Sequence, residues 1–264
     1  MGSLPISVQS PSDYSFPKNR LKTTQNEPSK DPLVLVACGS FSPVTTLHLQ
    51  MFEMASEFIK STTQFEIMGG YLSPVSDAYN KQGLASAVHR LRMCDLAVNE
   101  KSDSWLMVDP WEALQPKYTL TAEVLDHFGH EINDNLGGAM KPDGSRVPVK
   151  IMMLAGADLI ETMSLPRIWS HEDLQCILGD YGAFVVSRKG TDIEEALKSL
   201  KKWKENIYVF EPPSMNDTSS TKVRAYVKKR QSIGNLTPDP VIGYIEEHGL
   251  YQKDEISPKM ADEG

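Results

Sequence analysis

Two polar segments of this 264-residue chain, almost two hundred residues apart, carry groups suited to binding phosphate. In the first, Gly39 follows an apolar run at 33–38, and an amphipathic pattern begins near His48. A strand, a glycine turn and a helix start in this order direct backbone N–H groups and the positive end of a helix dipole at an anion. The second segment opens another predicted helix with hydroxyl groups and two cations, namely Ser219, Ser220, Thr221, Lys222 and Arg224. Together they predict a nucleoside triphosphate as ligand.

Short apolar runs alternate with helical patterns from residue 33 onward, and these elements must position the two segments. The predicted strands cover 33–38, 65–71, 105–108, 150–154, 183–186 and 207–210. Between the first two, Leu47, Met51, Met54 and Phe58 share one face of a helix. Because the strands lack polar alternation, they indicate a parallel sheet covered on both faces. We therefore predict a doubly wound α/β fold with a C-terminal helical piece, and ligands at the carboxyl ends of strands.

The domain prediction follows from composition along the chain. Residues 1–31 are rich in Ser, Pro, Asn, Thr and Lys and are interpreted as a disordered arm. A single catalytic domain is expected over 32–252, interrupted by a Gly-rich mobile loop at 129–148, and residues 253–264 are expected to form a disordered tail.

The bulk composition limits the kinds of molecule that the protein is expected to bind. A net charge of −8 gives no global support for nucleic-acid binding. No signal peptide and no run of eighteen apolar residues is present, so no membrane partner is expected and the protein is placed in the cytoplasm, the nucleus or both. The three cysteines are an odd number and include no CxxC pair, which favours a reducing compartment and disfavours a zinc site. No protein-held metal is predicted.

The polar segments also carry a resemblance. The string Gly39-Ser40-Phe41-Ser42-Pro43-Val44-Thr45-Thr46-Leu47-His48 resembles the first signature of the nucleotidylyltransferases, and Ser219-Ser220-Thr221-Lys222-Val223-Arg224 resembles their second. With Asp109-Pro110-Trp111-Glu112 and Leu154-Ala155-Gly156-Ala157-Asp158, the chain from about residue 33 to 251 is similar to the eukaryotic nicotinamide/nicotinic acid mononucleotide adenylyltransferases.

The resemblance implies direct attack of a mononucleotide phosphate on the α-phosphorus of ATP, so that the protein aligns the reactants and stabilises charge. The implied catalytic residues are His48, Lys222 and Arg224. The implied ATP-binding set adds Gly39, Ser40, Phe41, Thr45, Gly156, Asp158, Ser219, Ser220 and Thr221. Mg²⁺ is the implied cofactor, held mainly through the ATP phosphates. From its position alone, Asp158 could equally cap a helix.

The mononucleotide is the second implied ligand. The resemblance assigns to it Ser40, Phe41, Lys81, Trp111, Trp169 and Arg188. Lys81 would meet its phosphate, and the two tryptophans would enclose its pyridine ring by stacking. Without the resemblance, a solvated loop lysine and two core tryptophans are the ordinary interpretations of these residues.

Other functions stay open at this stage. A nucleotidylyltransferase acting on phosphopantetheine or an alcohol phosphate would share the fold, but it would not need an aromatic slot. A non-catalytic chaperone on the same fold is a second alternative. A P-loop kinase and a Rossmann dehydrogenase are disfavoured, because neither GxxxxGK[ST] nor GxGxxG occurs at the required place. A homo-oligomer is possible, but no sequence feature specifies one.

Overall fold

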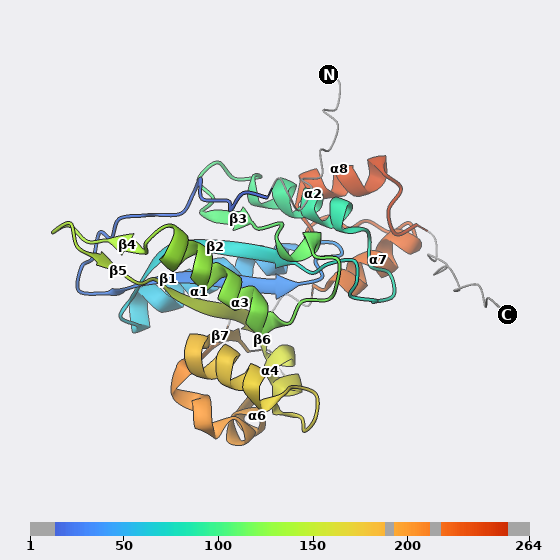
Figure 1. The fold of residues 1–264 in the computed structure, drawn as a ribbon. Helices are drawn as coiled ribbons and strands as arrows, with labels where there is room; N and C mark the ends of the chain where they lie inside the picture. Colours follow the sequence, from blue (N-terminus) through green and yellow to red (C-terminus); the bar gives the residue numbers. More distant parts are fainter. Residues whose placement is uncertain (1–13, 188–192, 212–217, 253–264) are drawn as a thin grey trace.

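The computed structural model describes residues 14–187, 193–211 and 218–252 (Figure 1). Its strands are β1 (Asp31–Gly39), β2 (Phe65–Pro74), β3 (Leu106–Val108), β4 (Ala139–Met140), β5 (Arg146–Val147), β6 (Lys150–Gly156), β7 (Ala183–Val186) and β8 (Ile207–Phe210). Its α-helices are α1 (Thr46–Thr62), α2 (Ala87–Val98), α3 (Thr121–Gly129), α4 (Ala157–Ser164), α5 (His171–Leu174), α6 (Ile193–Ser199), α7 (Ser220–Lys228) and α8 (Asp239–Glu247). Short 3₁₀ segments (Glu112–Leu114 and Lys201–Asn206) and π-helical segments (His130–Asn135 and Gln175–Tyr181) complete the assignment.

Six strands form one parallel sheet in the order β3-β2-β1-β6-β7-β8. The chain moves outward from β1 through β2 to β3, and then returns to place β6 on the other side of β1. The order therefore reverses between β1 and β6, and a crevice is expected at their carboxyl ends. Every predicted strand is present, and the doubly wound α/β fold is confirmed. No helix in the described residues is long and apolar enough to span a membrane.

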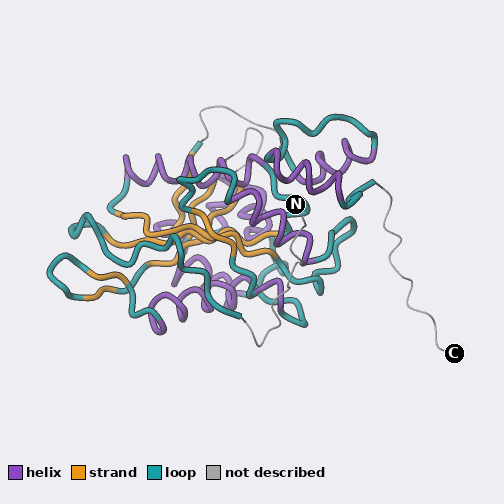
Figure 2. Tube along the Cα trace, turned by 90° about the horizontal axis from the view of Figure 1, so that it is seen from above, coloured by secondary structure: helices purple, strands orange, loops and turns teal. Residues whose placement is uncertain are grey.

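Helices cover both faces of this sheet, as the view from above shows (Figure 2). Alternate side chains of β1 enter different cores: Leu33 and Leu35 belong to a cluster with residues of α1, α2, α7 and α8, whereas Val34 and Val36 belong to a cluster with residues of α3, α4 and α6. All four are fully buried, which explains why no polar alternation is visible in this strand. Burying a side chain of this kind contributes roughly 1.5–3 kcal/mol.

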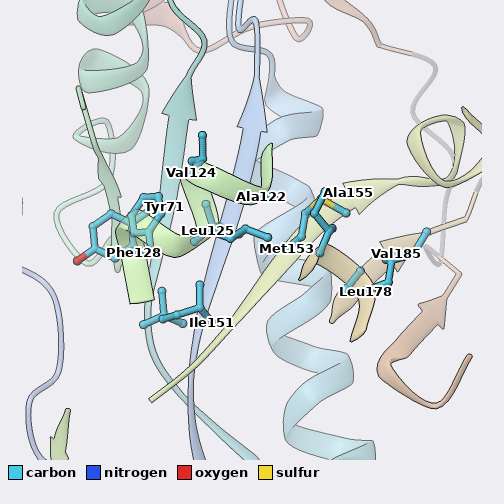
Figure 3. Close-up of a cluster of buried hydrophobic side chains, with 14 of the residues drawn as sticks. Tyr71, Ala122, Val124, Leu125, Phe128, Ile151, Met153, Ala155, Leu178 and Val185 are labelled. Carbon is cyan, nitrogen blue, oxygen red and sulfur yellow. The ribbon is translucent and has the colours of Figure 1, made fainter. Parts of the chain in front are cut away.

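The second of these cores positions the region around β3. Figure 3 shows Leu125 and Phe128 of α3 packed against Tyr71 of β2 and Ile151 and Met153 of β6. The Tyr71 and Phe128 rings lie 5.0 Å apart. This packing holds α3 against β2 and β6.

For residues 14–31, the structure corrects the expectation of a disordered arm at 1–31. Phe16 and Gln25 are buried, and the Lys22 and Gln25 N–H groups donate to carbonyls of Met68 and Met140. A few aromatic and apolar side chains anchor a segment whose average composition is polar, and averaging over the segment conceals them. Residues 1–13 and the expected tail at 253–264 lie outside the described part of the chain.

The segment at 129–148, which the sequence predicts to be a mobile loop, contains regular secondary structure. It begins with the π-helical segment His130–Asn135 and continues into a β4–β5 hairpin. Glycines adopt positive φ at the bends, including 74° at Gly137 and 86° at Gly144. The glycines therefore mark turns of a defined hairpin, which a Gly-rich composition alone does not distinguish from an irregular loop.

Candidate active site

A cavity of about 400 Å³ opens where the strand order reverses, between the carboxyl ends of β1 and β6. It gathers segments from both halves of the sheet and from α7. Of the residues expected from the sequence, those lining it are Gly39, Ser40, Phe41, His48, Lys81, Gly156, Asp158, Ser219, Ser220, Thr221 and Arg224. Two helix starts, those of α1 and α7, therefore meet at one cavity, as their phosphate-binding character predicts.

The turn after β1 is shaped by Gly39 and Phe41. Phe41 is 3% exposed and adopts a φ of 43°, which is uncommon for a residue with a side chain. A Cβ at Gly39 would lie 3.2 Å from the Phe41 ring, so the turn requires glycine or a displaced ring. The Phe41 ring meets the His48 imidazole edge-on, with ring centroids 5.1 Å apart. The turn thus fixes one side of His48.

Thr45 fixes the imidazole from the other side. Its backbone N–H donates to His48 Nδ1 at 2.9 Å, and its Oγ1 lies 2.8 Å from the same nitrogen. Because a backbone N–H can only donate, Nδ1 is the acceptor and the neutral ring carries its hydrogen on Nε2. Thr45 itself is fully buried and does not line the cavity. It orients His48, whereas the sequence led us to expect a direct ATP contact.

The two polar segments are joined by direct hydrogen bonds. Ser220 Oγ donates to the Pro43 carbonyl at 2.8 Å, and an Arg224 Nη donates to the Ser42 carbonyl at 2.8 Å. Ser219 caps α7 by accepting the Lys222 N–H at 3.2 Å. Arg224 therefore stabilises the turn after β1 and also lines the cavity. Lys222 is not among the cavity-lining residues.

The cavity is cationic at this end. Lys81 and Arg224 line it together, and burial, followed by the charge of Arg224, lowers the pKa of Lys81. A group with a lowered pKa beside a second cation is stabilised by a bound anion, which restores the charged form. Asp158 lies in the first turn of α4, whose cap position is taken by Gly156. It lines the cavity instead of capping the helix.

Arg90 is a site residue that motif analysis missed. It is fully buried in α2 and donates to the Ser40 carbonyl at 3.1 Å, the Ala85 carbonyl at 2.7 Å and Asp77 at 3.0 Å. These bonds tie the turn after β1 to the start of α2 and to the loop that contains Asp77. The signal in the sequence was a charged residue on the apolar stripe of α2, between Ala87 and Cys94.

The two tryptophans lie away from this cavity. Trp111 stacks on His127, with ring centroids 4.1 Å apart and an interplanar angle of 5°. The Trp169 indole N–H donates to Thr162 Oγ1 at 3.3 Å. Both pack against the core on the α3 side of the sheet. Trp111 lines a separate hollow with Tyr118 and Glu123. Arg188 lies outside the described residues.

Within the described ranges, no group of three or more His, Cys, Asp or Glu side chains is placed to hold a metal ion. Among its polar groups, the cavity offers mainly hydroxyl, amide and cationic donors for anionic oxygen.

A doubly wound sheet with such a cavity at its switch point defines a nucleotide-binding α/β protein. The family described as "Cytidylyltransferase-like" matches residues 36–226, and the chain belongs to this family. Its relatives include the "Nicotinamide/nicotinic acid mononucleotide adenylyltransferase 1" of Saccharomyces cerevisiae, 53% identical over 242 residues. That alignment covers 90% of this chain and 60% of the relative, so the chain spans less than two thirds of that relative's length.

Two other relatives are covered almost completely. The "Nicotinamide/nicotinic acid mononucleotide adenylyltransferase 1" of Bos taurus is 37% identical, and the alignment covers 85% of this chain and 90% of the relative. The "Nicotinamide/nicotinic acid mononucleotide adenylyltransferase" of Arabidopsis thaliana is 38% identical, with 90% of this chain and 98% of the relative covered. The resemblance inferred from the four sequence segments is confirmed.

Proposed function

We propose that this protein joins ATP to nicotinamide mononucleotide, and also to nicotinic acid mononucleotide, releasing pyrophosphate. The observation that carries the proposal is the single cavity in which both polar segments meet, tied together by the Ser220–Pro43 and Arg224–Ser42 hydrogen bonds. The names of the relatives supply the substrates. Other nucleotidylyltransferases would use the same cavity, so the acceptor must be tested directly.

The proposed reaction needs alignment more than covalent chemistry. A phosphate oxygen of the mononucleotide forms a bond to the α-phosphorus of ATP, and the bond from that phosphorus to the bridging oxygen of pyrophosphate breaks. His48 donates through Nε2–H to an α-phosphate oxygen as negative charge grows there. Ser219, Ser220 and Thr221, with Arg224 and Lys222, bind the β- and γ-phosphates and the departing pyrophosphate.

The remaining contacts place the two nucleosides. Asp158 accepts from ribose or adenine, and Gly156 allows the nucleotide to approach the backbone, because no atom lies within 4 Å of where its Cβ would be. Lys81 binds the mononucleotide phosphate beside Ser40. Trp111 and Trp169 stack on the pyridine. Mg²⁺ enters as part of the MgATP substrate and neutralises phosphate charge.

The acceptor is tested by measuring pyrophosphate release from MgATP with four phosphates in parallel: nicotinamide mononucleotide, nicotinic acid mononucleotide, phosphopantetheine and glycerol phosphate. We expect release only with the two pyridine mononucleotides, and NAD⁺ or its deamido form as the second product. Release with phosphopantetheine or glycerol phosphate would keep the chemistry and overturn the substrate. A folded protein that binds ATP but releases no pyrophosphate with any acceptor would overturn the enzyme proposal.

A further inference from the structure

Asp109 is a buried carboxylate that connects three parts of the chain. It follows β3, is 1% exposed, and its own N–H donates to the Leu72 carbonyl at 3.0 Å. Its Oδ1 accepts the Tyr14 hydroxyl at 3.1 Å and the Trp111 backbone N–H at 3.2 Å, and its Oδ2 accepts from His127 Nε2 at 2.9 Å. A buried carboxylate needs such partners, so removing one disturbs the others.

His127 connects Asp109 to the Trp111 side chain. Because a carboxylate only accepts, Nε2 of His127 carries a hydrogen, and Tyr14 Oη lies 3.0 Å from the same nitrogen. These two contacts fix the plane of the imidazole. The Trp111 indole lies parallel to that plane, 4.1 Å away, so one face of the indole is covered. A flat ligand ring can stack only on the opposite face.

Tyr14 brings the N-terminal segment into this arrangement, 95 residues before Asp109 in the sequence. The segment is anchored next to it, because the Phe16 ring packs on Tyr71 at 5.3 Å and the Pro17 carbonyl accepts the Tyr71 hydroxyl at 2.8 Å. Burial, and then the charge of Asp109, raise the pKa of Tyr14. Its hydroxyl therefore stays protonated, and able to donate, at neutral pH.

We propose that Tyr14, Asp109 and His127 form a positioning triad that presents one face of Trp111 to the pyridine ring of the mononucleotide. This inference rests on the proposed function and goes beyond it, since it gives the N-terminal segment a role in substrate affinity. Asp109 accepts a hydrogen bond from the backbone of Trp111, His127 stacks on its ring, and the Tyr14 hydroxyl contacts both Asp109 and His127. None of the three lines the cavity around His48, so they act through Trp111.

The test uses a pair of matched variants of the full chain, Tyr14→Phe and Tyr71→Phe. Each removes one hydroxyl that ties the N-terminal segment to the sheet region, but only the first removes a bond to Asp109. We expect Tyr14→Phe to raise the KM for nicotinamide mononucleotide about five- to tenfold, the effect of one lost buried hydrogen bond, with the KM for ATP and kcat nearly unchanged. Tyr71→Phe should leave all three constants near the wild-type values.

A second measurement requires neither substrate nor turnover. The emission of Trp111 is taken as the difference between each protein and the same protein carrying Trp111→Phe. Tyr14→Phe should change this difference spectrum, and Tyr71→Phe should not. Equal effects of the two variants on KM or on emission would show that the segment only anchors the fold, and unchanged values for Tyr14→Phe would also overturn the triad. If wild type turns over no pyridine mononucleotide, the proposed function fails, and the difference spectrum still decides the triad.

Discussion

The two ends of the proposed site are built in different ways. At the phosphate end, short sequence segments present backbone N–H groups and cations at helix starts, and hydrogen bonds tie Ser220 and Arg224 to the first turn. At the pyridine end, the important ring is an ordinary core-packed tryptophan whose orientation depends on Tyr14, Asp109 and His127. The proposed phosphate end is thus encoded mainly by local segments, whereas the proposed pyridine end depends on contacts between segments far apart in the sequence.

The largest effect is expected for a substitution at the phosphate end, which should change kcat, whereas a substitution at the pyridine end should change KM. His48→Ala removes the donor to the α-phosphate and should lower kcat by about 10²–10³, because such a donor acts mainly in the transition state. The KM for the mononucleotide should change little. Steady-state kinetics of pyrophosphate release measure both constants.

Trp111→Ala serves as the matched variant for the other end. Loss of a stacking surface should raise the KM for the mononucleotide while kcat falls less than in His48→Ala. If both variants lower kcat equally with unchanged KM, the division of the site into a phosphate end and a pyridine end is wrong.

The second effect concerns Glu112, which lies beside Trp111 but faces β2. It is 4% exposed and accepts the Ser73 hydroxyl at 2.5 Å. Burial raises the pKa of Glu112 from its ordinary value of 4.5 to about 7, although the Ser73 bond and Arg90 oppose the shift. Between these values the folded protein binds more protons than the unfolded chain, so the free energy of unfolding falls as pH rises from 4.5 through 7.

Glu112→Gln should flatten this pH dependence. The variant should be more stable than wild type at pH 8, by up to about 3 kcal/mol, and should have nearly equal stability at pH 4. Denaturant unfolding across this range measures the difference, with the exposed Glu57→Gln as control. A slope equal to that of wild type would show that folding does not raise the pKa of Glu112 and that this side chain organises the loop as an ion at neutral pH.

The same contrast explains what could be predicted from the sequence. The strands and the phosphate end were predicted because apolar runs and residues such as Gly39, His48 and Arg224 report local structure. Arg90 and Tyr14 were missed because their roles depend on distant partners: the Ser40 carbonyl lies 50 positions from Arg90, and Asp109 lies 95 positions from Tyr14. The sequence predicts that Thr45 contacts ATP, whereas in the structure its backbone N–H donates to the imidazole of His48.

Two glycines at the phosphate end should respond differently to the same added methyl group. In Gly39→Ala, the new Cβ would lie 3.2 Å from the Phe41 ring, which must move against His48. We expect a stability loss of about 1 kcal/mol, as for modest overpacking, together with a lower kcat. In Gly156→Ala, the Cβ meets no atom within 4 Å.

Gly156→Ala should therefore leave the melting temperature unchanged or slightly raised, but it should increase the KM for ATP if the nucleotide lies against that backbone. Thermal unfolding and ATP kinetics on the pair separate the two causes. An unchanged KM for ATP in Gly156→Ala would remove Gly156 from the nucleotide-binding surface. Equal losses of stability in the two variants would contradict the packing difference between the glycines.

The smallest effect is expected where the phosphate end is held redundantly. Tyr251 Oη lies 3.0 Å from Ser42 Oγ, and that oxygen also donates to the Gly83 carbonyl and accepts the Ala85 N–H at 2.9 Å. Tyr251→Phe removes one of three bonds, so the free energy of unfolding should fall by about 0.5–1.5 kcal/mol with kcat nearly intact.

Ser42→Ala removes all three bonds and leaves Gly83 and Ala85 without this partner, so the free energy of unfolding should fall clearly further. Denaturant unfolding of both variants checks this ranking. If Tyr251→Phe lowers kcat as much as Ser42→Ala does, the C-terminal contact sets the geometry of the turn, and the phosphate end depends on distant segments as strongly as the pyridine end.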